Sequence, residues 1–282
     1  MAKDQTQGGL GLPPMDADGI SARLGEAARE VRVEVYPTLD STSSEAKRRA
    51  RAGELGPLLI VAESQSNGRG RLGRSFYSPA GAGIYMTYLW RPQAAAVDAV
   101  SVTTAASVAV LRAMSSMEAL AGHELAIKWV NDIYLSGKKV CGILTEAVTD
   151  AADGSVSCML VGIGINVAPT AFPPELAEIA TSLCVKDLDR NELIARILRE
   201  LLACLHSRDP YAHMAYYRAH SLVIGRTVNT ICAGISTPGV VLDIAADGGL
   251  VVRREDGSVE VIRSGEVSLR FSREKGAESL IQ

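Results

Sequence analysis

The pattern of the chain changes near residue 222, and this change limits the fold more than any other feature of the sequence. Between residues 33 and 221, apolar strand-like runs alternate with segments of helical periodicity. From Thr227 to Phe271, short β-rich runs alternate with Asp-Gly turns, and no helical pattern is visible. We therefore predict a first domain at 33–221 and a small five-stranded barrel or sandwich at 222–272. A flexible tail with a short helix is expected at 1–32, and a second tail at 273–282.

Several segments of the first domain have clear local signals. Dense apolar runs at Leu58–Ala62 and Gly83–Trp90 predict buried strands, and the Ala- and Val-rich segment Val97–Leu120 predicts a long helix packed on them. Thr42 and Glu45 have capping-box spacing, which predicts a helix that opens at Thr42. Strand-like segments between residues 125 and 167 are separated by tight-turn signals, which predicts an antiparallel meander.

Composition argues against several functional classes. The 282 residues carry 29 Lys plus Arg against 32 Asp plus Glu, and this balance argues against a general nucleic-acid binder. The uncharged stretch Ala99–Leu111 is too short to span a bilayer, and no signal peptide is visible, so we expect no membrane association. The five cysteines are scattered and include no Cys-x-x-Cys pair, which favours reduced thiols in a cytoplasmic protein.

The strongest local signal is the loop Gly68-Arg69-Gly70-Arg71-Leu72-Gly73-Arg74. It has the Gly-x-Gly-x-x-Gly form of a dinucleotide fingerprint, but Ser75-Phe76-Tyr77-Ser78-Pro79 follows, which is no helix start, so we reject a Rossmann site. Glycines let backbone N–H groups approach a ligand, and arginines supply forked donors for phosphate or carboxylate. The loop therefore indicates either a binding site for an anionic small molecule or a solvated basic turn. With no anion bound its arginines would repel one another, so we expect the loop to be mobile until a ligand binds.

Three further segments carry weaker signals. Lys128-Trp129-Val130-Asn131-Asp132 suits a phosphate and metal site, although an ordinary polar turn has the same composition. Lys139-Val140-Cys141-Gly142-Ile143-Leu144 places a glycine inside a strand, which often marks close approach to a ligand. Gly162-Ile163-Gly164-Ile165-Asn166 also places glycines inside a strand. They mark either close approach to a ligand or a place where neighbouring side chains need room to pack.

Taken in order, these segments resemble the biotin protein ligases of the holocarboxylase synthetase type. The resemblance rests on Asp40-Ser41-Thr42-Ser43, Gln65 with the arginine-glycine loop, Lys128-Trp129-x-Asn131-Asp132, Lys139-x-x-Gly142-Ile143-Leu144-x-Glu146, Gly162–Asn166 and Ser264–Arg270. It covers about residues 33–271. It implies an α+β fold in which a mixed β-sheet flanked by helices, of the class II synthetase-like type, precedes a small SH3-like β-barrel.

The resemblance also implies a two-step reaction. Biotin, the substrate, attacks the α-phosphate of MgATP to give biotinyl-5′-AMP, and a lysine of a biotin carboxyl carrier domain then displaces AMP. ATP and Mg²⁺ are thus the implied cofactors, and the carrier domain is the implied partner. Lys139 and Arg71 would be catalytic.

The other site residues are carried over in the same way. The implied biotin-binding set is Ser41, Thr42, Ser43, Gln65, Gly68, Arg69, Gly70, Arg71, Lys139, Gly142 and Gly164. The implied nucleotide-binding set is Phe76, Asn131, Asp132, Asn166 and Arg270, with Asp132 a candidate magnesium contact. Ser43 and Val130 depart from the family pattern, which usually has asparagine and proline there.

Alternatives stay open at this point. A lipoate or octanoate ligase shares the fold, but the chain lacks the triple-glycine segment typical of those enzymes. A non-catalytic biotin sensor would be expected to lose the lysine or loop arginines, and all are present. The segment before Val33 is too short and glycine-rich for a winged helix, so we expect no DNA binding. The resemblance leaves open the carrier protein and whether the chain forms a homodimer.

Overall fold

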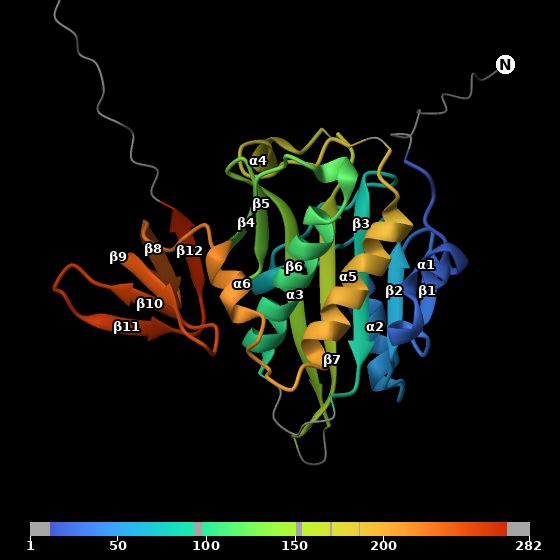
Figure 1. Ribbon diagram of the computed structural model, residues 1–282, viewed down its shortest axis with the longest axis horizontal. Helices are drawn as coiled ribbons and strands as arrows, with labels where there is room; N and C mark the ends of the chain where they lie inside the picture. The colour runs from blue at the N-terminus through green and yellow to red at the C-terminus, as the bar shows by residue number, and fades with distance from the viewer. Residues whose placement is uncertain (1–11, 93–97, 151–153, 170, 186, 270–282) are drawn as a thin grey trace, which may run out of the picture. The chain divides into compact units, whose positions relative to one another are not determined.

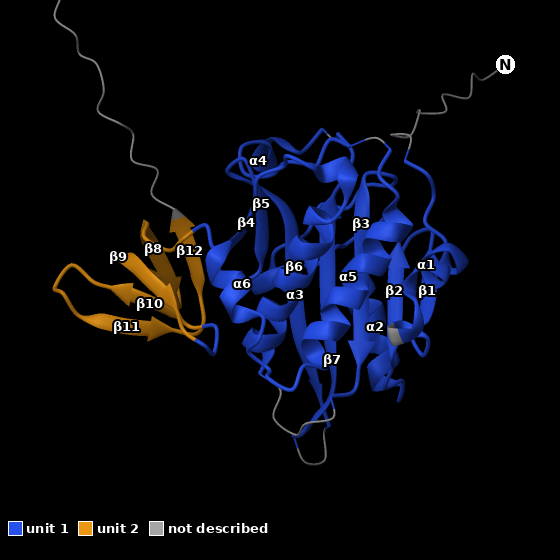
Figure 2. Ribbon diagram, viewed as in Figure 1, with its two compact units in different colours: residues 1–222, 246–248 blue, residues 223–245, 249–282 orange. Residues whose placement is uncertain are grey.

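The computed structural model describes residues 12–92, 98–150, 154–169, 171–185 and 187–269 (Figure 1). The chain divides into two compact units: unit 1 comprises residues 1–222 and 246–248, and unit 2 comprises residues 223–245 and 249–282 (Figure 2). The predicted α+β fold, with a mixed sheet flanked by helices and a C-terminal antiparallel sheet, is confirmed.

Unit 1 is built on a seven-stranded sheet in the order β1-β2-β3-β7-β6-β5-β4. Its strands are β1 (Arg32–Tyr36), β2 (Leu58–Ala62), β3 (Gly83–Trp90), β4 (Leu125–Lys128), β5 (Asp132–Leu135), β6 (Lys138–Thr149) and β7 (Val156–Asn166). β1 and β2 pair in parallel, and the other neighbours pair antiparallel, so the predicted meander from β4 to β7 is confirmed.

Six α-helices lie in the described part of unit 1. They are α1 (Ala17–Leu24), α2 (Thr42–Arg51), α3 (Ala99–Ser115), α4 (Pro174–Ala177), α5 (Arg190–Leu205) and α6 (Met214–Ala219). The expected helix over 97–120 is shorter than predicted, because α3 ends at Ser115 and a separate 3-10 turn covers Glu118–Leu120. None of the helices in the described ranges is long and apolar enough to cross a bilayer.

The predicted capping box at Thr42 is wrong by one residue. Ser41 is the N-cap of α2, and its hydroxyl accepts a hydrogen bond from the Ser44 amide at 3.4 Å. The Glu45 carboxylate instead pairs with Arg48 and Arg49 along the helix, at 2.9 and 2.8 Å. Helix α2 therefore begins where predicted, but Ser41 rather than Thr42 caps it, which leaves the Thr42 side chain available for other contacts.

The two faces of the sheet are covered by different helices. Thr145 of β6 hydrogen bonds Thr103 of α3 at 2.9 Å, so its neighbours Leu144 and Glu146 point to the opposite face. On that opposite face, Ala46 and Ala50 of α2 pack in a core cluster with residues of β2, β3, β6 and β7: Leu58, Ile60, Leu89, Val148, Cys158 and Leu160. The face that carries α2 also carries the candidate site.

Unit 2 is a five-stranded antiparallel sheet in the order β11-β10-β9-β8-β12. Its strands are β8 (Thr227–Cys232), β9 (Ile235–Ile244), β10 (Leu250–Arg253), β11 (Val259–Ile262) and β12 (Glu266–Leu269). The predicted Asp256-Gly257 turn joins β10 to β11, and Gly257 has a φ of +86°, a conformation that favours glycine.

Candidate active site

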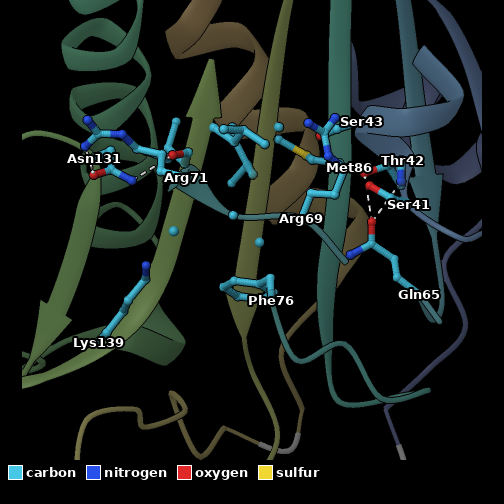
Figure 3. Close-up of a pocket in the computed structure, with 17 residues that line it drawn as sticks. Ser41, Thr42, Ser43, Gln65, Arg69, Arg71, Phe76, Met86, Asn131 and Lys139 are labelled. Atoms are coloured by element: carbon cyan, nitrogen blue, oxygen red, sulfur yellow. Dashed lines mark hydrogen bonds between the residues drawn. The ribbon is translucent and has the colours of Figure 1, made fainter. Parts of the chain in front are cut away.

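A cleft on the α2 side of the unit 1 sheet gathers most of the residues that the sequence singled out (Figure 3). Twelve predicted residues line it: Ser41, Thr42, Ser43, Gln65, Arg69, Gly70, Arg71, Phe76, Asn131, Lys139, Gly142 and Gly164. Five residues to which the sequence assigned no binding role complete the lining; Ile143, Leu144, Gly162 and Ile163 lie in the segments it singled out, and Met86 does not. Segments far apart in the sequence thus meet at one place.

One end of the cleft is a hydrogen-bonded network of neutral side chains. The Gln65 side-chain oxygen accepts from the Thr42 amide at 2.8 Å and from the Thr42 hydroxyl at 3.2 Å, and its Nε2 donates to Ser78 at 2.8 Å. The Thr87 hydroxyl donates to Thr42 Oγ1 at 2.9 Å and lies 3.2 Å from Ser43 Oγ. Since Thr87 is fully buried on β3, this network fixes the hydroxyls and the amide before any ligand arrives.

Two glycines leave room on the floor of the cleft. A Cβ added to Gly164 would lie 2.6 Å from the Phe76 ring, and one added to Gly142 would lie 2.9 Å from Lys139 Nζ. The Phe76 ring also packs edge-on against Tyr85, with 6.3 Å between ring centroids. Gly142 and Gly164 therefore allow an aromatic ring and a lysine ammonium to lie against the sheet.

The arginine-glycine loop is a tight turn rather than the start of an α-helix. Gly70 donates to the Arg74 carbonyl at 2.7 Å, and Arg71–Gly73 forms a single 3-10 turn. The rejection of a Rossmann site is therefore confirmed, because a dinucleotide loop must lead into a helix.

Arg69 faces a carboxylate that the sequence left without a role. Its two terminal nitrogens bind Glu146 of β6 in a bidentate pair, at 2.9 and 3.0 Å. Lys47 of α2 also donates to Glu146, at 3.2 Å. The Glu146 side chain is largely buried, at 16% exposed, so this carboxylate holds the Arg69 fork in one orientation at the cleft.

At the other end of the cleft, Arg71 binds the segment after β4. Its Nη1 donates to the Asn131 side-chain oxygen at 2.9 Å, and the Asn131 Nδ2 donates to the Ile143 carbonyl at 2.8 Å. The peptide bond between Trp129 and Val130 is cis. The Val130 carbonyl accepts from the Tyr217 hydroxyl at 3.1 Å, and burial raises the Tyr217 pKa, so that hydroxyl stays protonated.

Lys139 forms the third cation of the cleft. Its Nζ lies 2.7 Å from Asp132 Oδ1, as an ion pair, although that oxygen has no aligned hydrogen bond from the residues that the structure describes. The neighbouring Cys141 is fully buried, which raises its pKa and keeps the thiol protonated. Cys141 is therefore no nucleophile, and Lys139 is the cation of β6 that lines the cleft.

Asp132, the predicted magnesium contact, offers a single carboxylate. In the described ranges no three His, Cys, Asp or Glu side chains gather as a metal cluster. Mg²⁺ in phosphate-transfer sites is commonly held by one or two carboxylates, substrate phosphates and water. Asp132 offers one carboxylate to that arrangement, and its Oδ1 is already paired with Lys139 Nζ at 2.7 Å.

Gly68, Asp132 and Asn166 are described by the structure but are not among the residues that line the cleft. Gly68 supports the loop, since its carbonyl accepts from the Phe76 amide at 2.8 Å. Asn166 donates to the Thr181 carbonyl at 3.0 Å and so holds the segment beyond β7. Arg270 lies outside the described residues. The binding roles assigned to these residues stay predictions.

Comparisons with known proteins place this fold and cleft in a class. Residues 36–166 match the biotin/lipoate A/B protein ligase family. Residues 223–270 match the biotin protein ligase C-terminal domain. The second match and the relatives below narrow the class: the chain belongs to the biotin protein ligase family.

The similar proteins cover most of the chain. It is 32% identical to a biotin–[acetyl-CoA-carboxylase] ligase of Mycobacterium tuberculosis, over 90% of this chain and 96% of the relative. It is also 32% identical to the bifunctional ligase/repressor BirA of Bacillus subtilis, over 83% of this chain and 73% of the relative. The biotin protein ligase of Aquifex aeolicus in complex with biotin and ATP is 28% identical, with a TM-score of 0.69 over 85% of this chain and 99% of that chain.

Proposed function

We propose that the chain is a biotin protein ligase that activates biotin with MgATP and transfers it to a lysine of a biotin carboxyl carrier domain. The observation that carries the proposal is the cleft itself. It brings the Gln65–Thr42 network to one end and the cations Arg71 and Lys139 to the other, in a chain of this family. A polar end and a cationic end suit a ligand with a neutral head and an anionic tail.

In the first step a biotin carboxylate oxygen attacks the α-phosphorus of ATP, and the bond to the leaving pyrophosphate breaks. Both reacting groups are anions, so the barrier contains their mutual repulsion. Lys139 and Arg71 would lower it by offsetting the charge that builds as the two groups meet, and they are positioned before the reaction begins.

The neutral end of the cleft is assigned to the biotin head. Ser41, Thr42, Ser43 and Gln65 offer donors and acceptors to it. Thr87 orients the Thr42 and Ser43 hydroxyls, and Thr42 and Ser78 orient the Gln65 amide. Phe76 and Asn131 are assigned to the nucleotide, where the ring would stack on the base. Asp132, with phosphate oxygens and water, would hold Mg²⁺, which supplies positive charge to the phosphates when bound.

In the second step the neutral ε-amine of the carrier lysine attacks the acyl carbon of biotinyl-AMP. The amide bond forms, AMP leaves with the electrons of the broken acyl–phosphate bond, and the amine gives up a proton. No cysteine intermediate is needed, in agreement with the protonated Cys141 thiol.

Incubation of the chain with biotin, MgATP and a biotin carboxyl carrier domain tests the proposal, with the carrier weighed by mass spectrometry. A mass increase of one biotin, absent when ATP is omitted, is the expected result. An octanoyl or lipoyl increase instead would identify the rival ligase, and biotin binding without transfer would identify a sensor. The cytoplasmic location and the lack of DNA binding stay predictions.

A further inference from the structure

Arg190, the first residue of α5, is a buried arginine that no sequence pattern singles out. Its side chain is only 2% exposed. Nη1 donates to Glu63 Oε2 and to the Gly83 carbonyl, both at 2.9 Å, and Nη2 donates to Glu63 Oε1 at 3.2 Å. A guanidinium buried to this extent, with a carboxylate and a carbonyl on one fork, fixes the groups it joins with little freedom.

The two groups that Arg190 joins are the two ends of one segment. Glu63 directly follows β2, and Gly83 is the first residue of β3. Residues 64–82 between them carry Gln65, the arginine-glycine loop and Phe76. The β2–β3 ladder pairs Ala62 with Tyr85, and Arg190, outside the cleft, adds a buried tie just beyond that pair, at the base of the segment that supplies a large part of the cleft wall.

The segment before α1 also contacts Arg190 and Glu63. Arg190 Nη2 also donates to the Pro13 carbonyl at 2.5 Å, and Glu63 Oε1 accepts from the Met15 amide at 2.6 Å. Arg190 Nε is buried and has no acceptor within the described part of the chain. A buried ion pair often adds little to the free energy of unfolding, because both charges lose their hydration. We therefore interpret the pair of Arg190 and Glu63 by the geometry that it fixes.

We propose that Arg190 is a positioning residue for the ligase reaction. By holding Glu63 and Gly83 together, it keeps residues 64–82 in the arrangement that binds ligand. The inference rests on the proposed function, because the consequence of a loose segment is measured on biotin. If only a fraction of the protein holds the segment correctly, the apparent affinity for biotin falls by that fraction, while saturating biotin restores the correct state.

The test compares Arg190→Lys with Arg196→Lys. Lysine keeps the charge but cannot bind Glu63 and Gly83 as a fork. Arg196 lies on the same helix and pairs with Glu192 at 2.5 Å, away from residues 64–82, so its variant is the matched control. For R190K we expect amide hydrogen exchange in residues 64–82 to rise about tenfold without ligand, with β6 unchanged. The biotin KM for pyrophosphate release should rise about tenfold and kcat should fall less than threefold.

Unchanged exchange in residues 64–82, or an equal rise throughout the chain, would overturn the proposal. If R190K does not fold, the double variant R190M/E63Q replaces it, because removing both charges leaves no buried charge unpaired. If amide hydrogen exchange in residues 64–82 of the double variant is faster than in wild type, the positioning role is supported. If its exchange and its biotin KM equal those of wild type, the positioning role is overturned. The exchange measurement needs no biotin, so a wild-type chain that fails to bind biotin would refute the proposed function separately.

Discussion

Replacing Lys139 by methionine is the sharpest test of the proposed adenylation chemistry. Methionine keeps an unbranched apolar stem beside Gly142 and removes only the ammonium, which lies 2.7 Å from Asp132. At a separation of about 4 Å, two unit charges interact by about 4 kcal/mol at an effective dielectric of about 20. Losing one contact made in a transition state typically costs about 10²–10³ in rate. Because the Lys139 side chain is 32% exposed and solvent screens it, we expect a loss of about 10².

The assay is biotin-dependent pyrophosphate release at saturating ATP, followed by transfer from synthetic biotinyl-AMP to the carrier domain. K139M should slow the first reaction about a hundredfold while it leaves transfer from the supplied adenylate within about tenfold of wild type. The matched control is K138M, since the neighbouring Lys138 donates to the Ala177 carbonyl at the surface rather than into the cleft. Thermal unfolding of both variants checks that they fold.

Pyrophosphate release by K139M within a few-fold of wild type would refute the reasoning, because the reacting anions would then need no charge from this position. Equal losses in both reactions would also refute it, since they would point to a damaged cleft rather than to a missing charge in adenylation.

Three further predictions concern other parts of the site and core. Gly164→Ala should raise the KM for ATP several-fold, because the added Cβ would displace the Phe76 ring. In the double variant with Phe76→Leu, the rise in KM should be smaller than the product of the two single rises. A rise equal to that product would show that the two residues act independently. Thr87→Val should destabilise the protein by about 1–3 kcal/mol in urea unfolding and weaken biotin binding, whereas Thr87→Ser should preserve both. Burial lowers the pKa of His213 to about 4 in the folded protein. As the pH falls, this histidine is therefore protonated in the unfolded chain before it is protonated in the folded one. The free energy of unfolding should decrease as the pH drops from about 6.5 towards about 4. His213→Gln should flatten that part of the stability profile, and an unchanged slope would exclude His213 as its source.

The sequence predicted the strands and the cleft better than the contacts that fix them. β2 and β3 have the bounds that their apolar runs predicted, because a continuous apolar run is typical of a buried strand. Thr87 had no signal, since one threonine in an apolar strand looks like an ordinary strand residue. Arg190 begins a helix and looks like a surface charge, and only the tertiary structure buries it against Glu63. Such partners are non-local, so no spacing rule finds them.

The same limit applies to the charges of the cleft. From sequence, the loop arginines were expected to repel one another in the absence of an anion. In the structure each of the cations in the cleft faces a polar partner: Arg69 faces Glu146, Arg71 faces Asn131, and Lys139 faces Asp132. These partners reduce the repulsion, so the cations can be held close together before ligand binds.

Ligand binding at such a site is an exchange of partners rather than the filling of an empty cationic pocket. A hydrogen bond to a charged group contributes about 1.5–3 kcal/mol net, so a ligand gains only the difference between its own contacts and those it replaces. An ion that reaches only one cation gains little by this exchange. A ligand that presents a carboxylate and a phosphate together can exchange with Arg71 and Lys139 at once while its head uses the Gln65 network. If the proposed roles of Arg71 and Lys139 hold, we expect the pairing of each cation to favour a ligand that carries both anionic groups over an ion that carries one.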